Sequence, residues 1–210
     1  MRFLRFFSAL ISLMALTYIL RSEPLEAQRS AAQPLVAPSG RVETSVSFDG
    51  RLIGTIWLNR STSHSGPARM VVDYGQPHAR GRSIFGGLVP YGEVWRLGAN
   101  MATHLTLDLN VRLGDLEVPR GAYTLYLIPR EDGAQLIVNR QTKQWGTEYS
   151  LPQDLGRVQL HRRDLPETSE SLTITLEPVL PQRQEDLPKG ALRIAWGEVE
   201  YSTEWTVTWP

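Results

Sequence analysis

Apolar and polar residues alternate along most of this chain, and the alternation predicts β-strands. The clearest case is residues 105–113, where apolar side chains recur at every second position: Leu105, Leu107, Leu109, Val111 and Leu113. A period of two places neighbouring side chains on opposite faces of a strand, so we expect one strand with a buried and a solvated face. Residues 122–128, AYTLYLI, are almost continuously apolar, which predicts a strand buried on both faces.

Shorter runs of β-branched, aromatic and aliphatic residues recur along the rest of the chain, between Gly, Pro and Asp turns. We predict strands at residues 42–48, 52–58, 69–74, 116–118, 135–139, 157–161, 172–177, 192–199 and 203–209. Asp49-Gly50 predicts a hairpin between the first two of these runs. The polar stretches 59–68, 162–170 and 182–189 are expected to be surface loops.

The sequence predicts very little helical structure. No amphipathic helix of ordinary length is indicated, and only residues 90–96, with Pro90 near their start, are expected to form one helical turn. About ten short strands separated by turns are typical of an antiparallel β-sandwich or a barrel-like relative. We therefore predict an all-β fold, an antiparallel β-sandwich with one long ordered irregular loop, in a single domain that spans residues 41–210.

The long irregular loop is predicted at residues 74–104, which do not follow the alternation. This segment combines six glycines with aromatic residues and interleaved charged residues. Glycine supplies unusual backbone angles and the aromatic side chains hold such a loop against a core. Because binding and catalytic residues concentrate on loops that a scaffold positions, we expect the functional site of the protein here.

Three stretches of the chain carry a resemblance to a known family. They are GRSIFGGLVPYGEVWRLGAN at residues 81–100, VPRGAYTLYLIP at residues 118–129 and QWG at residues 144–146. With them, residues 42–210 resemble the bacterial DUF2911 family, a family of unknown function. An acidic residue often follows Gly-Ala-Asn in that family, whereas Met101 stands there in this chain. The resemblance implies a bacterial protein, and it assigns no catalytic or binding residues.

The first residues of the chain have the layout of a secretory signal peptide. Arg2 and Arg5 precede an apolar run at residues 6–20, and Ala27 offers a small residue for cleavage. The run is short for a membrane span, so we predict a signal peptide at residues 1–27, and a periplasmic or secreted protein without stable membrane insertion. An uncleaved signal anchor is the alternative. Residues 28–40, rich in Pro, Ala, Ser and Gln, are expected to be a flexible leader.

Charge and cysteine content exclude several classes of function. The chain has 22 basic and 22 acidic side chains, and removal of residues 1–27 takes away three arginines and two glutamates. Such a balance predicts no nucleic-acid partner. The chain has no cysteine, which excludes disulfides, a thiol nucleophile and zinc held by cysteine. No cofactor is predicted.

Two arginines of the central segment are candidates for ligand contacts. The guanidinium groups of Arg82 and Arg96 can hold a carboxylate or phosphate in a two-pronged grip. Alternatively, each arginine braces the loop by donating to its backbone carbonyls. Asn100 also has two possible roles, as a ligand contact or as a turn residue. We expect Arg96, beside Trp95, to be the ligand contact and Arg82 to be the brace.

Four more residues complete the set of candidate ligand-binding residues: Trp95, Glu93, His78 and His104. Glu93, His78 or His104 could serve a hydrolase or isomerase, with Arg82 or Arg96 as the anion holder. A metal site is not predicted, because no two histidines have the spacing that places two ligands on one face. Several tryptophans could form a platform for sugars, although such residues are more often core: Trp95, Trp145, Trp196, Trp205 and Trp209.

The sequence therefore predicts an exported module that binds a small molecule, a saccharide or a carboxylated metabolite, beside the central segment. Two alternatives belong to other classes. One is the hydrolase or isomerase described above, and the other is a purely structural component of the cell envelope.

Overall fold

A computed structural model describes residues 38–48, 51–53, 56–58, 68–183 and 186–208 of the 210-residue chain. All of them belong to one compact unit, Ala37–Pro210. The predicted signal peptide, most of the predicted leader, the Asp49-Gly50 turn and nearly all of the loop predicted at residues 59–68 lie outside the described residues. In the described part of the chain, no helix is both long and apolar enough to cross a membrane.

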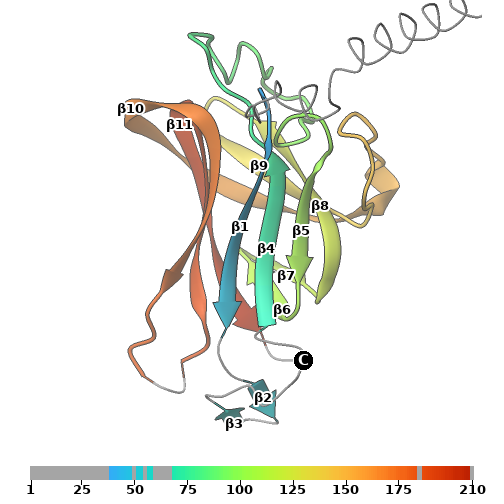
Figure 1. Cartoon of the computed structure of the whole chain (residues 1–210), viewed down its shortest axis with the longest axis vertical. Helices are drawn as coiled ribbons and strands as arrows, with labels where there is room; N and C mark the ends of the chain where they lie inside the picture. Colours follow the sequence, from blue (N-terminus) through green and yellow to red (C-terminus); the bar gives the residue numbers. More distant parts are fainter. Residues whose placement is uncertain (1–37, 49–50, 54–55, 59–67, 184–185, 209–210) are drawn as a thin grey trace, which may run out of the picture. The chain divides into compact units, whose positions relative to one another are not determined.

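Strands dominate the described residues, and nine of them form one continuous antiparallel sheet (Figure 1). These strands are β1 Arg41–Phe48, β4 Ala68–Gly75, β5 Thr103–Leu107, β6 Asn110–Leu113, β7 Leu116–Val118, β8 Gly121–Pro129, β9 Gly133–Asn139, β10 Asp154–Val179 and β11 Lys189–Thr208. Their order is β1-β4-β5-β8-β9-β10-β11-β6-β7. The prediction of an all-β fold is confirmed, and the finer prediction of a sandwich stays a prediction.

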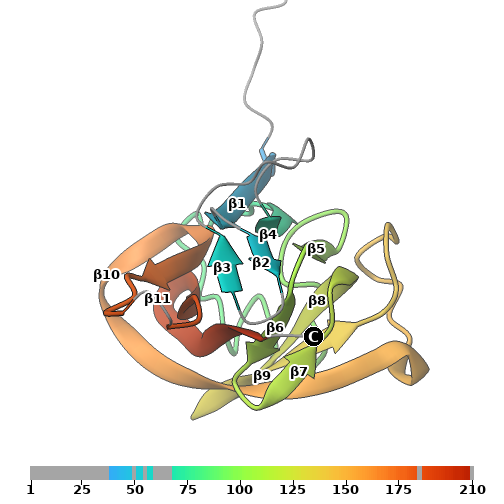
Figure 2. The same cartoon turned by 90° about the horizontal axis from the view of Figure 1, so that it is seen from below.

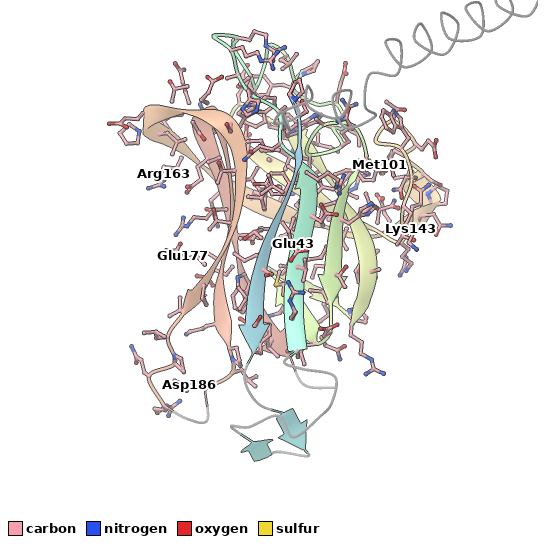
Figure 3. The ribbon with its side chains drawn as sticks, viewed as in Figure 1. Glu43, Met101, Lys143, Arg163, Glu177 and Asp186 are labelled. Atoms are coloured by element: carbon pink, nitrogen blue, oxygen red, sulfur yellow. The ribbon has the colours of Figure 1, made fainter. Side chains whose placement is uncertain are left out.

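The sheet curls on itself (Figure 2). β1 and β7 both contact β10, although neither is hydrogen-bonded to it. Large apolar side chains fill the enclosed space, among them Trp196, Trp205 and Tyr201. Charged side chains such as those of Glu43, Arg163 and Glu177 are exposed on the outside (Figure 3). Burial of one face of each strand explains the alternation that the sequence displays.

Two long strands, β10 and β11, run through the curled part of the sheet, where the sequence predicted four separate strands. β10 pairs with β9 between residues 154 and 161, and with β11 at residues 161–164, 169 and 173–179, with register shifts on both sides of Ser169. The predictions of separate strands at 157–161 and 172–177, with a surface loop between them, are therefore wrong. So is the division of β11 into residues 192–199 and 203–209. Residues 162–170 are mostly exposed and polar, which makes a paired segment resemble a loop, and register shifts bend the strand there.

The prediction of one strand at residues 105–113 is also wrong, because the chain turns in the middle of it. β5 pairs with β4 and β8, whereas β6 pairs with β11 and β7. Leu107 at the end of β5 and Val111 in β6 are both buried. Both strands bury the same set of alternating positions, so the period of two runs unbroken through the bend.

The predicted hairpin of residues 42–48 and 52–58 is not formed. β1 pairs with β4 over its whole length, with Phe48 opposite Ala68 and Val46 opposite Met70. Residues 51–58 instead contain two short strands, β2 Arg51–Ile53 and β3 Ile56–Leu58, which pair with each other. Pairing with β4 places the buried side chains of β1 in the main core, and this tertiary packing outweighs the local turn signal.

Candidate functional site

The central segment connects β4 to β5, and residues 76–102 contain turns and isolated bridges but no strand. The helical turn predicted at residues 90–96 is wrong. Its backbone groups bond to β8 and not within a helix. The amide of Gly92 donates to the carbonyl of Pro129 at 2.9 Å, and Trp95 and Leu127 exchange two backbone hydrogen bonds of 2.8 Å.

The two ends of this segment meet at Gly75. The amide of Ala99 donates to the carbonyl of Gly75 at 3.0 Å. A Cβ atom at position 75 would lie 2.0 Å from the carbonyl oxygen of Ala99, so only glycine allows this approach. The segment is therefore a closed loop whose last residues are held beside the end of β4.

Apolar and aromatic side chains of the loop enter the core. Ile84, Phe85 and Leu97 are buried. The ring of Phe85 meets Tyr201 edge-on at 5.0 Å, and the indole of Trp95 stacks on Trp196 at 5.5 Å with an angle of 16° between the planes. These contacts hold the loop against the sheet, and Trp95 is thereby fixed at the margin of the core.

Arg82 is engaged with the loop itself. Its Nε donates to the carbonyl of Ala79 at 2.9 Å, and its Nη2 donates to the carbonyl of His78 at 2.8 Å. These are the bonds of a brace, because backbone acceptors in an irregular segment need donors. His78 is itself tied to β10, where its Nδ1 lies 2.8 Å from the hydroxyl of Ser171.

Arg96 donates fewer hydrogen bonds than Arg82. Its Nε donates to the carbonyl of Gly98 at 3.1 Å, and its terminal nitrogens form no hydrogen bond with any described residue. Its alkyl chain packs on Gly146, where an added Cβ would lie 2.1 Å from Cδ of Arg96. The side chain is half-buried. Arg96 therefore has a fixed stem and a guanidinium group with donors to spare.

Asn100 acts as a turn residue. Its backbone is left-handed, with φ of 63°, a conformation that asparagine tolerates better than most residues. Its carbonyl accepts a hydrogen bond from the amide of Gly146 at 3.1 Å. Its side-chain amide donates to the carbonyl of Ser39 at 3.4 Å. Asn100 thus joins the loop to the connection between β9 and β10.

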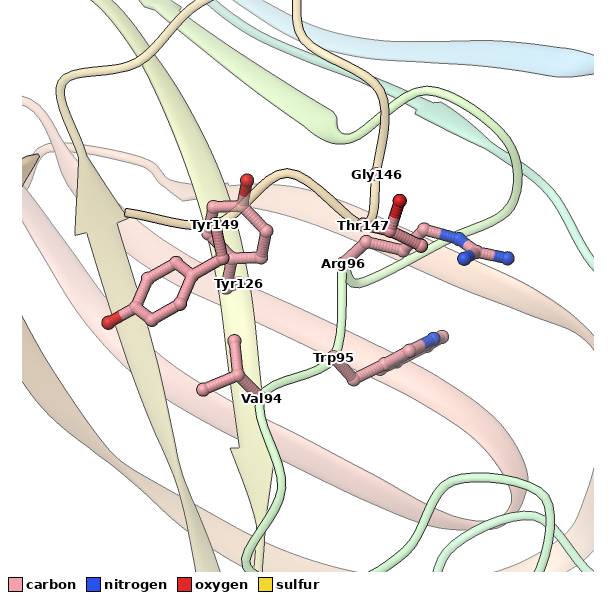
Figure 4. Close-up of a pocket in the computed structure, with 7 residues that line it drawn as sticks. All are labelled: Val94, Trp95, Arg96, Tyr126, Gly146, Thr147 and Tyr149. Carbon is pink, nitrogen blue, oxygen red and sulfur yellow. The ribbon is translucent and has the colours of Figure 1, made fainter. Parts of the chain in front are cut away.

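An open depression of about 440 Å³ lies where this connection meets the loop (Figure 4). Seven residues line it: Val94, Trp95, Arg96, Tyr126, Gly146, Thr147 and Tyr149. Trp95 and Arg96 are among the residues selected from the sequence. The other candidates, Arg82, Glu93, Asn100, His78 and His104, do not line it. The structure therefore brings two of the seven candidates to this depression.

A buried polar network holds Tyr126, one of the lining residues, in place. The hydroxyl of Tyr126 donates to the carbonyl of Glu148 at 2.8 Å, and Nε2 of Gln144 donates to that hydroxyl and to the Thr124 hydroxyl, both at 3.0 Å. Buried hydrogen bonds of this kind fix side chains in one geometry. Gln144 and Gly146 belong to the QWG stretch of the resemblance. Tyr126 and Tyr149 were not selected from the sequence, because each is one aromatic residue among many.

Residues 59–204 match the family described as "Protein of unknown function (DUF2911)". The chain belongs to the DUF2911 family. Searches of curated proteins and of solved structures give no match. The match covers the closed loop, the strand β8 and the β9–β10 connection, and thus every residue that lines the depression.

The two tyrosines of this DUF2911 site are neutral phenols at ordinary pH. Burial raises the pKa of Tyr126 above its usual value of 10.0. Burial also raises the pKa of Tyr149, and the hydrogen bond to the Asp154 carboxylate adds to the increase. Among the described residues, no three histidine or acidic side chains gather in a way that could hold a metal ion.

His104 titrates at lower pH than a free histidine. Partial burial on β5, with the positive charge of Arg41 as the second cause, lowers the pKa of His104 below its ordinary 6.5, and the Asp73 carboxylate opposes this. The unfolded chain therefore takes up this proton first as pH falls. Stability from neutral His104 is present above pH 6.5 and is lost between 6.5 and the lower pKa of the folded protein.

We expect His104→Gln to reduce the acid sensitivity of the fold. Melting temperatures of the wild type and the variant, measured at about pH 7.5 and about pH 5.5, should show a smaller drop for the variant. His161→Gln serves as the control, since His161 is exposed on β10. An equal drop in the wild type and His104→Gln would show that His104 does not contribute.

Proposed function

We propose that this DUF2911 protein binds a small molecule, a saccharide or a carboxylated metabolite, in the depression beside the closed loop. The proposal rests chiefly on Arg96. Its stem is held by Gly98 and Gly146, while its terminal nitrogens have no hydrogen-bond partner among the described residues. A half-buried guanidinium with unused donors is suited to bind an anionic or hydroxylated ligand.

The rest of the lining favours a small organic ligand. Trp95, Tyr126 and Tyr149 contribute aromatic rings, and Thr147 contributes a hydroxyl group. Aromatic walls with a few polar groups are typical of small-molecule sites, and about 440 Å³ lies in the lower part of their usual range of roughly 300–1,000 Å³. A site lined in this way combines surface for a carbon skeleton with groups that orient it.

The two arginines of the loop provide the test. Arg82→Ala removes both donors from the carbonyls of His78 and Ala79, and we expect it to lower the free energy of unfolding by roughly 1–3 kcal/mol. Arg96→Ala removes one such bond, and we expect a smaller loss without ligand. Melting curves of both variants, with and without a panel of sugars and carboxylates, measure these effects.

The ligand-dependent part of this experiment decides the proposal. A ligand that binds only the folded state raises the melting temperature. A compound that raises the melting temperature of the wild type should therefore also raise that of Arg82→Ala, and it should leave the melting temperature of Arg96→Ala unchanged. A large loss of stability in Arg96→Ala without ligand, together with no compound that shifts the wild-type curve, would contradict the proposal and leave the loop as architecture.

We also propose that the protein is exported. Two N-terminal arginines followed by the apolar run at residues 6–20 support this. Mass spectrometry of the protein from its host should find a chain that begins near Gln28 in a periplasmic or secreted fraction. Recovery of the intact chain from Met1 in the inner membrane would favour a signal anchor instead.

A further inference from the structure

The depression has two flanks of different chemistry. Figure 4 shows Val94 and the rings of Tyr126 and Tyr149 on one side of the segment 94–96, and the side chains of Trp95 and Arg96 on the other. Tyr126 and Tyr149 meet edge-on at 5.0 Å, with 67° between their planes. The Arg96 side chain extends away from the tyrosines (Figure 4), so the depression has a tyrosine flank and an arginine flank, and a ligand that meets both lies across the segment 94–96.

The tyrosine flank can accept hydrogen bonds but has no phenolic proton left to donate. The Tyr126 hydroxyl donates to the carbonyl of Glu148, and the Tyr149 hydroxyl donates to Oδ2 of Asp154, both at 2.8 Å. A phenol has one proton and two lone pairs, and each hydroxyl already accepts one hydrogen bond, from Nε2 of Gln144 at 3.0 Å and from Nη2 of Arg157 at 3.2 Å, so one lone pair remains on each. A ligand group on this flank is therefore a carbon surface against the rings or a hydroxyl that donates, and a carboxylate would find no phenolic donor there.

Charged side chains beside the tyrosine flank are also relevant to where a carboxylate of the ligand would bind. Burial is the main cause that raises the pKa of Tyr126, and the carboxylates of Glu148, which is exposed, and of Asp154 both add to the increase. Arg157 offsets Asp154, to which its Nε and Nη2 donate at 3.3 and 3.2 Å, and its Nη2 also donates to the Tyr149 hydroxyl at 3.2 Å. No described partner of this kind offsets Glu148. Arg157 is already paired with a carboxylate, whereas Arg96 is not paired with one among the described residues, so a carboxylate of the ligand is better served by Arg96.

The arginine flank has the opposite chemistry. Arg96 keeps its terminal nitrogens as donors, and these suit a carboxylate because a planar guanidinium can donate to both of its oxygens. The bond from Nε to Gly98 and the close packing of Gly146 restrict the stem. Less side-chain freedom remains to be lost on binding, which favours affinity.

We propose that the ligand is a sugar acid, a hydroxylated ring that carries one carboxylate, of the class to which the hexuronates belong. The carboxylate binds Arg96, and the ring lies on the tyrosine flank with its hydroxyls as donors. This inference rests on the proposed function and narrows it, because a neutral sugar leaves Arg96 without an anion and a simple carboxylic acid leaves the tyrosine flank empty.

Isothermal titration calorimetry with five probes tests the inference. D-glucuronate and D-galacturonate carry both parts, D-glucose and D-galactose lack the carboxylate, and propanoate lacks the ring. We expect at least one hexuronate to bind about tenfold more tightly than its neutral hexose, which is the scale of one charge-assisted contact. It should also bind more tightly than propanoate, which lacks the ring. In Arg96→Gln, which keeps a polar side chain without the charge, the affinity for that hexuronate should fall to the level of the neutral hexose.

The outcomes separate the inference from the proposed function. Equal affinity for a hexuronate and its neutral hexose, or for a hexuronate and propanoate, overturns the sugar-acid inference and leaves a small-molecule site. Hexuronate binding that survives Arg96→Gln overturns the assignment of the carboxylate to Arg96. If none of the five probes binds, the inference fails, whereas the proposed function fails only if the wider panel of sugars and carboxylates also leaves the melting curve unchanged.

Discussion

Leu107→Asp is expected to unfold the protein under conditions in which Thr106→Asp stays folded. Leu107 is 3% exposed at the end of β5, where it lies opposite Met70 of β4 and Gly121 of β8. An unpaired carboxylate at this position costs several kcal/mol, which is comparable with the whole stability of an ordinary domain, about 5–15 kcal/mol. Circular dichroism melting curves of the two variants measure the difference.

Thr106→Asp is the matched control, because Thr106 is the neighbouring residue of the same strand and its side chain is exposed. Any general effect of an added negative charge on β5 is present in both variants. Equal melting temperatures for Leu107→Asp and Thr106→Asp would contradict the assignment of the two faces of β5.

Gly75→Ala is expected to produce the second large loss, because it separates the two ends of the closed loop. The new Cβ atom would lie 2.0 Å from the carbonyl oxygen of Ala99, and two backbone segments cannot move apart without loss of the bond from the Ala99 amide. Forcing atoms into a packed site costs typically about 1–3 kcal/mol. We expect a loss of stability at the upper end of this range for Gly75→Ala, because the new Cβ atom would meet backbone atoms. Urea denaturation measures this loss.

Gly81→Ala distinguishes this clash from the general effect of removing a glycine in the loop. Gly81 has φ of 71°, and an added Cβ there meets no atom within 4 Å. The expected cost is that of the left-handed backbone alone, roughly 1–2 kcal/mol. If Gly81→Ala destabilised the protein more than Gly75→Ala, the close approach of residues 75 and 99 would not be a main constraint on the loop.

The faces of the strands could be predicted from the sequence because burial on one side leaves a direct mark on the pattern. Residues 123–129 of β8 are all buried, as their continuous apolarity predicts. The ends of the strands could not be predicted in the same way. The bend between Leu107 and Val111 keeps both side chains buried, so the alternation passes through it without a change.

The pairing of strands that lie far apart in the chain could not be predicted from a single sequence, because it leaves no local pattern. Residues 162–170 of β10 have the polar composition of a loop, and residues 162–164 and 169 among them pair with the distant strand β11. Likewise, the partner of β1 is β4 and not the nearest apolar run, because shared burial in the core decides the pairing.

Part of the candidate site could be predicted from the sequence. The mixture of glycine and aromatic residues indicated the closed loop, and Trp95 and Arg96 lie at the depression. Tyr126 sits in an apolar strand and Tyr149 in the connection after β9, and neither position suggests a shared wall. The bridge between Trp95 and Leu127 brings the loop to β8, and no local pattern in the sequence announces it.

A residue-resolved map of the binding surface tests the central claim, a ligand site beside the closed loop, most directly. Backbone ¹H–¹⁵N correlation spectra of the protein, recorded during a titration with the tightest-binding compound of the panel, provide this map. The account predicts that the largest shifts fall at residues 94–96 and 146–149, on both sides of the depression. Saturable shifts centred on another part of the sheet, with residues 94–96 and 146–149 unchanged, would contradict it.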